Sequence, residues 1–372
     1  MKYFLLTILF IFLINTNKKN FTDPEISAYS LGLKFENNYK LTLGKPELKS
    51  RFEDKKWSIW GASMVKCDDG LYHLFYSRWE KELGWAWVTD SEIAHAVSSS
   101  PFGPFEFKDV ALPLRGKEYW DGLCTHNPTI HKFDGKYYLY YMGNTGDGKV
   151  VSSPGNVVIN PIHRNNQRIG VAVADNPNGP WKRFDTPLID VSPEKNAIDA
   201  LMVSNPSITQ RPEGGYLMVY KAVGKHRPGI WGGPVVHCVA TAESPTGPFK
   251  KFENPVFQAK GYDFPAEDPF IWYEEGKYRA IVKDMNGAFT NAGRALVLFE
   301  SEDGFNWELS KNPLVSILEI NWADGNKQKV LHLERPQLYI ENGKPVVLLC
   351  ASDIKDEKGV LQSFNVQIPV IY

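Results

Sequence analysis

The feature that most constrains this 372-residue chain is a short pattern that occurs four times. Each copy has a polar pair, a proline, an apolar run, a glycine turn and an aromatic run. The copies begin at His126-Asn127-Pro128, Ser204-Asn205-Pro206, Glu267-Asp268-Pro269 and Glu334-Arg335-Pro336. A degenerate fifth copy starts at Gly61-Ala62-Ser63. With Ser63 taken as the equivalent of the prolines, successive copies lie 65, 78, 63 and 67 residues apart. Such self-similarity is typical of repeat architectures.

A second pattern follows each hairpin in the same phase. A Pro-x-Gly-Pro-aromatic turn occurs at residues 101–105, 177–181 and 245–249, and Ser301 to Trp307 replaces it in the fourth unit. Each unit therefore holds four short strands joined by tight turns. One four-stranded meander cannot bury both faces, whereas a ring of them can. We predict an all-β fold, a five-bladed β-propeller with four-stranded antiparallel blades. A β-sandwich would not require a four-strand period. The segment from Ser27 to Leu43 is expected to complete the last blade.

Composition supports a globular fold and limits the partners. Aromatic residues make up 13% of the chain, and its 30 glycines and 25 prolines punctuate short apolar runs. The formal net charge of −1 gives no global field that would attract nucleic acid or anionic lipid. The four cysteines show no metal-ligand spacing, so we interpret them as buried small hydrophobic residues. We expect no metal and no cofactor, apart from a cation that the central channel could hold.

The first 20 residues are predicted to be a signal peptide. Met1-Lys2 is a positive start, and Tyr3 to Ile14 is an apolar stretch too short to cross a bilayer comfortably. The cleavage position is not evident. Residues 21–372 are then a single propeller domain, exported to the periplasm or secreted, with no stable membrane insertion after cleavage. The oligomeric state is left open.

In a propeller, the first strand of each blade lines the axis, so its start presents side chains at one mouth. The repeat therefore predicts a ligand floor made of the polar pairs, which are His126-Asn127, Ser204-Asn205, Glu267-Asp268 and Glu334-Arg335. Asn127 and Asn205 have the equal alternative of capping a turn. The charged pairs are harder to explain structurally, because adjacent charges at a crowded axis are costly unless used.

Further candidates surround this floor. Asp121 and Asp199 each lie six residues before an Asn-Pro pair, and Trp120 beside Asp121 offers the flat apolar face that a sugar ring needs. Positive charge is expected at the same rim from Arg78, Lys221 and Lys283, and from His163 and Arg164 in a long loop. These basic residues favour an anionic substrate.

The pattern resembles a known enzyme family. Proline-initiated blades, DGKYYLYY at residues 134–141 and SEDGFNW at residues 301–307 are similar to glycoside hydrolase family 43, with features like those of family 117. The resemblance implies a glycosidase in which a first-blade Asp is the base and a Glu two residues before a proline is the acid. Glu267 and Glu334 match the Glu-x-Pro form, but Ala62-Ser63 stands where the base is expected. By likeness to family 117, Asp121, Asp268 and Glu334 would act with His126 or His332.

The chemistry then expected is hydrolysis of an O-glycosyl bond by paired carboxyl groups, on oligosaccharides from plant or algal polysaccharides that carry an anionic or anhydro sugar. Asp121, Glu267, Asp268 and Glu334 should converge in one pocket with His126 or His332. The alternatives are a lyase or dehydratase that uses the same pocket, a sialidase, or a non-catalytic sugar-binding propeller. A β-fructosidase would need an Asn-Asp-Pro motif and a Glu-Cys pair, and neither is present.

Overall fold

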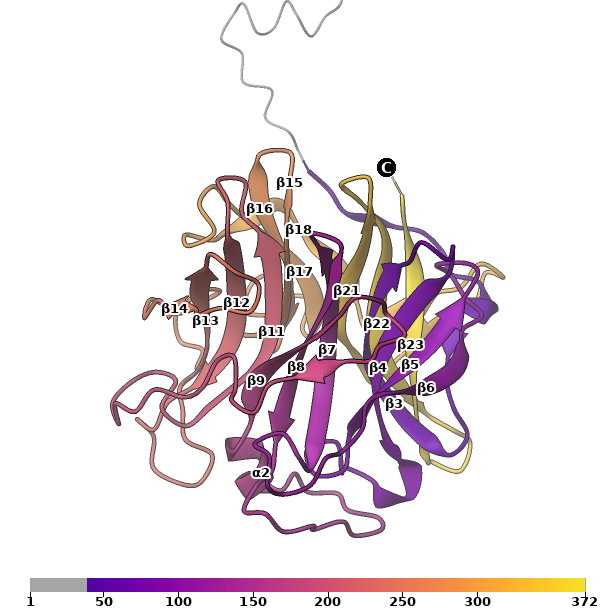
Figure 1. The fold of residues 1–372 in the computed structure, drawn as a ribbon. Helices are drawn as coiled ribbons and strands as arrows, with labels where there is room; N and C mark the ends of the chain where they lie inside the picture. The colour runs from indigo at the N-terminus through magenta and orange to yellow at the C-terminus, as the bar shows by residue number, and fades with distance from the viewer. Residues whose placement is uncertain (1–38, 372) are drawn as a thin grey trace, which may run out of the picture. The chain divides into compact units, whose positions relative to one another are not determined.

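The computed structural model describes residues 39–371. They form five antiparallel sheets arranged in a ring, whose innermost strands contact one another around the axis; Figure 1 views the ring from the side. Each sheet has four strands along its main path, so the predicted five-bladed β-propeller is confirmed. The predicted signal peptide lies outside the described residues. Among those residues, no helix has the length and apolarity needed to cross a membrane.

The strands follow the predicted units closely. The first blade has β3 (Trp57–Lys66), β4 (Tyr72–Glu80), β5 (Glu92–Ser98) and β6 (Glu106–Leu112). The second has β7 (Cys124–Phe133), β8 (Lys136–Asn144), β9 (Arg168–Ala174) and β10 (Lys182–Arg183). The third has β11 (Met202–Gln210), β12 (Tyr216–Val223), β13 (Val235–Ala242) and β14 (Lys250–Lys251). The fourth has β15 (Ala266–Glu274), β16 (Lys277–Asp284), β17 (Ala295–Ser301) and β18 (Glu308–Ile317).

The fifth blade closes the ring with strands from both ends of the described chain. It has β21 (His332–Glu341), β22 (Lys344–Lys355) and β23 (Leu361–Ile371), and β1 (Thr42–Leu43) is its outermost strand. The short β2 (Arg51–Phe52) also pairs with β23. The expectation that a segment before the first blade completes the last one is therefore confirmed for β1, and residues 27–38 lie outside the described residues.

Few other elements occur in the described part of the chain. They are the 3₁₀ turns η1 (Leu48–Ser50) and η2 (Lys81–Leu83), the helix α2 (Pro161–Asn165), and a hairpin of β19 (Glu319–Asn321) and β20 (Lys327–Lys329). α2 starts where its sequence predicts a helix start, because the Asn160 side chain accepts from the backbone N–H groups of Ile162 and His163. In Figure 1, α2 lies with long loops at the lower end of the propeller.

The hydrophobic core is divided into five clusters, one between each pair of neighbouring blades. Phe75 of the first blade, for example, packs with Leu139 and Tyr141 of the second, and Tyr140 of the second packs with Met218 of the third. The four cysteines are free and buried in this apolar material, as expected. Each blade thus buries both faces only because it has two neighbours, which is the physical reason for a closed ring.

The innermost strands of all five blades share a β-bulge, which positions the candidate site. In every innermost strand the register shifts by one residue, after Trp60, His126, Ser204, Glu267 and Glu334. The next residue has positive φ each time, near +50°, at Gly61, Asn127, Asn205, Asp268 and Arg335. Gly61 is therefore the equivalent of Asn127, and Ala62 is the equivalent of the prolines. The sequence alignment that placed Ser63 there was wrong by one residue, because it lacked this bulge.

Candidate active site

A cavity of about 760 Å³ opens at the end of the propeller where the innermost strands begin. The side chains just before each bulge line it, namely Trp60, His126, Ser204, Glu267 and Glu334. Loops that connect the second and third strands of the blades form its outer wall. They include residues 84–87 and 155–159, which are joined by a hydrogen bond from the Trp85 N–H to the Asn156 carbonyl (2.6 Å).

The positive-φ residues form a polar belt beneath the cavity. Asn127 Nδ2 donates to Asn205 Oδ1 (2.9 Å), and Asn205 Nδ2 donates to Asp268 Oδ1 (2.7 Å). Arg335 donates to Asp268 Oδ1 and to the Asn127 carbonyl, each at 3.4 Å. Gly61 gives Arg335 its room, since a Cβ there would lie 3.0 Å from Asn127 Oδ1 and 3.4 Å from the Arg335 Cγ. The belt joins all five blades, and its guanidinium disfavours a metal cation in the same place.

Above the belt, four charged side chains alternate in sign. Lys221 Nζ donates to Glu267 Oε1 (2.6 Å), and Lys283 Nζ donates both to Glu267 Oε2 (3.0 Å) and to Glu334 Oε1. The blade register explains the arrangement, because Lys221 lies opposite Ser204 and Lys283 lies opposite Glu267. Both lysines therefore occupy the same position of successive blades and point to the axis.

These neighbouring charges shift the pKa values of the two glutamates in opposite directions. Burial alone would raise the pKa of Glu267, but Lys221 and Lys283 together hold the pKa of that carboxyl well below its ordinary value. Burial raises the pKa of Glu334, and the nearby Glu267 and Asp268 add to the rise against the single ammonium of Lys283. Burial and Glu267 also raise the pKa of Asp268. Two carboxyl groups whose pKa values are pushed apart are what acid and base roles require.

The two candidate histidines line the same cavity in different environments. His332 Nδ1 lies 2.9 Å from both carboxylate oxygens of Asp353, and this hydrogen bond raises the pKa of His332. Its other nitrogen is therefore available on the cavity side. His126 is fully buried, contacts Ser91 Oγ at 2.7 Å, and has a pKa well below the ordinary value because of that burial and the Arg335 charge. With its pKa raised, His332 is better suited to carry a proton than His126, whose pKa is lowered.

Aromatic side chains form much of the wall. Trp87 lies over His126 with ring centroids 5.1 Å apart, and Trp60 meets His332 edge to face at 6.2 Å. Trp85 and Trp231 line the cavity and are each more than two-fifths exposed. Flat apolar surfaces around a few convergent polar groups are features of a small-molecule binding cleft.

Asp121 and Asp199 are outside this cavity, which corrects the expectation that Asp121 joins the carboxylate cluster. Asp121 is wholly buried between Arg115 (2.7 Å), Arg183 (3.5 Å) and the Tyr141 hydroxyl (2.6 Å). Asp199 pairs with Lys251 at 2.6 Å. Each is paired with a cation of its blade's outermost strand, Arg183 of β10 or Lys251 of β14, and Asp121 also pairs with Arg115 of the loop before β7.

Four other candidates also lie elsewhere. Trp120 stacks on Tyr141 and donates to the Phe184 carbonyl. Arg78 pairs with Glu92 and lies over the Trp57 ring, because it is one residue out of phase with the axis-facing Ser77. His163 is buried beneath its loop and contacts the Lys149 carbonyl. Arg335 is in the belt, 1% exposed. None of these four side chains lines the cavity.

Sequence reasoning missed several cavity residues. Arg294 belongs to the loop between β16 and β17, and Asp353 lies directly opposite His332 in the register of β21 and β22. Arg164 was noticed only as the neighbour of His163, yet it is the residue that lines the cavity. Trp60 occupies the axis position of the degenerate first copy, where correct placement of the bulge would have found it.

Comparison with known proteins then places the fold. No protein-family model and no curated protein sequence matches this chain. Among solved structures, a family 117 glycoside hydrolase from the marine bacterium Zobellia galactanivorans aligns with a TM-score of 0.58 and 18% identity, over 89% of this chain and 90% of its own. The fold is that of the propeller glycosidases.

Two further structures show the same likeness. A thermostable family-43 glycoside hydrolase aligns with a TM-score of 0.56 and 16% identity, over 86% of this chain and 93% of its own. An endo-arabinase from Bacteroides thetaiotaomicron aligns with a TM-score of 0.52 and 13% identity, over 88% and 98%. The predicted resemblance is confirmed at the level of the fold.

Proposed function

We propose that this protein is a glycoside hydrolase that cleaves O-glycosyl bonds in oligosaccharides carrying an anionic sugar, such as a uronate or a sulfated residue. The observation that carries the proposal is the pair of carboxyl groups, Glu267 and Glu334, which are 17% and 15% exposed at the floor of a cavity walled by tryptophans. The similarity of the fold to propeller glycosidases supports it.

The opposite pKa shifts of Glu267 and Glu334 suit the two carboxyl groups to different catalytic roles. Glu267 stays ionised between its two lysines, so it is suited to activate water or to stabilise positive charge at the sugar ring. Glu334, whose pKa is raised, is suited to give a proton to the leaving oxygen. His332, held by Asp353, is a second proton donor on the same side of the cavity. The first blade supplies Gly61 where a base carboxylate was expected, so Glu267 takes that role.

We assign the binding of the substrate's anionic group to Arg164 and Arg294 rather than to Lys221 and Lys283. Lys221 and Lys283 are already neutralised by Glu267 and Glu334. Arg164 donates to the neutral Asn165 side chain and the Trp231 carbonyl. Arg294 is exposed and has no carboxylate partner among residues 39–371. Both guanidinium groups can therefore donate hydrogen bonds to a carboxylate or sulfate, anions that arginine binds in a bidentate manner.

The signal-peptide sequence makes export part of the same proposal. An exported enzyme of this kind would act in the periplasm or outside the cell on plant or algal oligosaccharides. Its partner is then the oligosaccharide, and the near-zero net charge gives no reason to expect nucleic acid.

The test is to incubate the purified protein with neutral, uronate-containing and sulfated oligosaccharides, and to follow products by mass spectrometry. Hydrolysis adds one water per bond cleaved, which is the expected result. Glu267→Gln should abolish it, whereas Glu213→Gln, an exposed glutamate paired with Arg211, should not. An unsaturated product without added water would instead indicate a lyase. Binding without turnover in the unmodified protein would indicate a sugar-binding propeller.

A further inference from the structure

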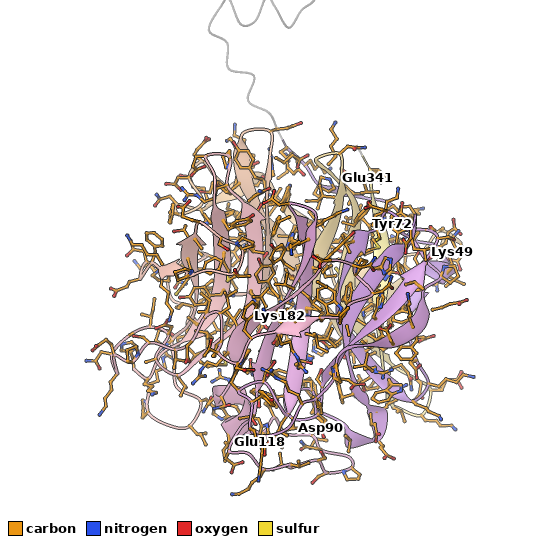
Figure 2. The ribbon with its side chains drawn as sticks, in the orientation of Figure 1. Lys49, Tyr72, Asp90, Glu118, Lys182 and Glu341 are labelled. Carbon is orange, nitrogen blue, oxygen red and sulfur yellow. The ribbon has the colours of Figure 1, made fainter. Side chains whose placement is uncertain are left out.

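A second cluster of chemically active side chains lies at the other end of the first blade. The turn between β3 and β4 brings together Cys67, Asp69 and His73, whose ligand atoms all lie within 4.8 Å of one another. Figure 2 labels Tyr72 beside this turn and Glu341 close to it, at the end opposite Asp90 and Glu118. Seven residues of β-strand separate Cys67 from the cavity residue Trp60, which is roughly 20 Å.

The contacts of His73 and His95 need one more hydrogen atom than two neutral imidazole rings can supply. His73 Nε2 faces Asp69 (3.2 Å), His73 Nδ1 faces His95 Nε2 (2.9 Å), and His95 Nδ1 faces Asp109 (3.1 Å). Three contacts require three hydrogens, but two neutral imidazoles carry only two. Both rings are 0% exposed, so an extra proton would place a positive charge in a buried position.

A metal ion between His73 and Asp69 removes this shortage. His73 Nδ1–H then donates to His95, His95 Nδ1–H donates to Asp109, and the free lone pair of His73 Nε2 points at the metal. A ligating histidine whose other N–H is fixed by such a relay is the usual arrangement in metal sites.

The separation of the nitrogen and oxygen donors fits a tetrahedral ion, and the Cys67 sulfur lies within 4.8 Å of both. Nitrogen and oxygen ligands, each about 2.0–2.2 Å from zinc, are roughly 3.3–3.5 Å apart. The observed separations of His73 Nε2 from the two Asp69 oxygens are 3.2 and 3.4 Å. The Cys67 sulfur completes a sulfur, nitrogen and oxygen donor set and accepts from the Tyr137 hydroxyl (3.4 Å), which would stabilise a thiolate.

We propose that Cys67, Asp69 and His73 bind one Zn²⁺ ion, with a water molecule as the fourth ligand. The Asp69 side chain is 39% exposed, so it provides the route of entry from solvent. The ion would fix the β3–β4 turn to β5 and β6 through the His73–His95–Asp109 relay. Its effect would be on the stability of the first blade rather than on the distant cavity, and it is independent of the proposed function. It also revises the interpretation of Cys67 as only a buried small hydrophobic residue.

The test is calorimetric titration of the untagged, chelator-treated protein with zinc chloride. We expect one ion per chain and a rise in melting temperature on binding. Asp69→Asn and Cys67→Ser should weaken binding at least tenfold, and His95→Gln by roughly 10–100-fold. Cys350→Ser, which alters another buried free cysteine, should bind as the unmodified protein does.

Cobalt provides a second readout. Co²⁺ bound to the unmodified protein should show thiolate charge-transfer absorption in the near ultraviolet, and Cys67→Ser should lose it. Asp69→Asn changes an exposed side chain, so it stays informative if Cys67→Ser fails to fold. Absence of zinc binding, or equal binding by Asp69→Asn and the unmodified protein, would overturn the proposal.

Discussion

Lys283 donates hydrogen bonds to both Glu267 and Glu334, so a single buried ammonium joins the two carboxyl groups at the centre of the propeller. One partner comes from the opposite strand of its own blade and the other from the next blade. The contact therefore links the closure of the ring to the charge state of the site, and several consequences can be measured.

Removal of this ammonium should destabilise the fold. Lys283→Met removes the buried ammonium that two partly exposed carboxyl groups share, and breaking a buried ion pair typically costs about 3–5 kcal/mol. Urea denaturation at neutral pH measures the loss. Lys277→Met is the matched control, since Lys277 pairs with Glu302 on the surface and such pairs contribute at most about 1 kcal/mol. Equal losses in the two variants would show that the ion pairs of Lys283 stabilise the fold no more than a surface ion pair does.

The hydrogen bond between His332 and Asp353 should make the free energy of unfolding depend on pH. The pKa of His332 is raised in the folded state by its hydrogen bond to Asp353, so the charged form stabilises the fold. That stabilisation is complete below the unfolded pKa of about 6.5 and is lost as the pH rises through the higher folded value. The free energy of unfolding, measured from pH 5 to pH 9, should therefore fall across this window in the unmodified protein.

His332→Asn should remove this part of the pH dependence, whereas His226→Asn, at an exposed histidine, should keep it. Glu267 acts in the opposite direction, because its pKa is lowered in the folded state. Its contribution is present above the unfolded pKa of about 4.3 and is lost as the pH falls toward the folded value. Glu267→Gln should therefore flatten the acid side of the same curve.

The belt predicts that Gly61 is sensitive to substitution. Gly61→Ala forces a side chain into positive φ and places its Cβ 3.0 Å from Asn127 Oδ1. Gly135 also has positive φ, but nothing lies within 4 Å of a Cβ there. Both variants lose roughly 1 kcal/mol from backbone strain. Gly61→Ala should lose more, and thermal unfolding of the two variants would isolate the crowding; equal melting temperatures would contradict the packing of Arg335 against Gly61.

The proposed anion contact is tested by kinetics on an anionic substrate. Arg294→Ala and Arg164→Ala should raise KM about tenfold, the size expected for one charge-assisted hydrogen bond, with little change in kcat. The effect should shrink at high salt, because exposed charges are screened. Arg211→Ala, far from the cavity and paired with Glu213, is the control. An unchanged KM in both cavity variants would exclude these arginines from substrate binding.

The repeat allowed the sequence to predict the blades, because proline and glycine mark strand starts and turns in a fixed phase. It also placed Glu267, Glu334, Lys221 and Lys283 at the axis, since strand periodicity alone determines which side chains face inward. It could not reveal the bulge after Trp60, because the first copy has neither the proline nor a polar residue at that position. Backbone dihedrals were needed to align Gly61 with Asn127.

Asp121 shows the other limit of sequence reasoning. Its spacing from Asn127 is the same as that of Asp199 from Asn205, but the partners Arg115 and Lys251 come from segments that no local pattern connects to them. Arg294 and Asp353 were missed for a similar reason, since a loop residue and an opposite-strand residue enter the cavity only after the chain has folded.

The most direct test of the central claim is the turnover of Glu334→Gln on a confirmed oligosaccharide substrate, measured together with its binding affinity. If Glu334 is the general acid, kcat should fall by roughly 10²–10⁴-fold while the dissociation constant changes little. Near-normal turnover, or a loss of turnover explained fully by lost binding, would contradict the account.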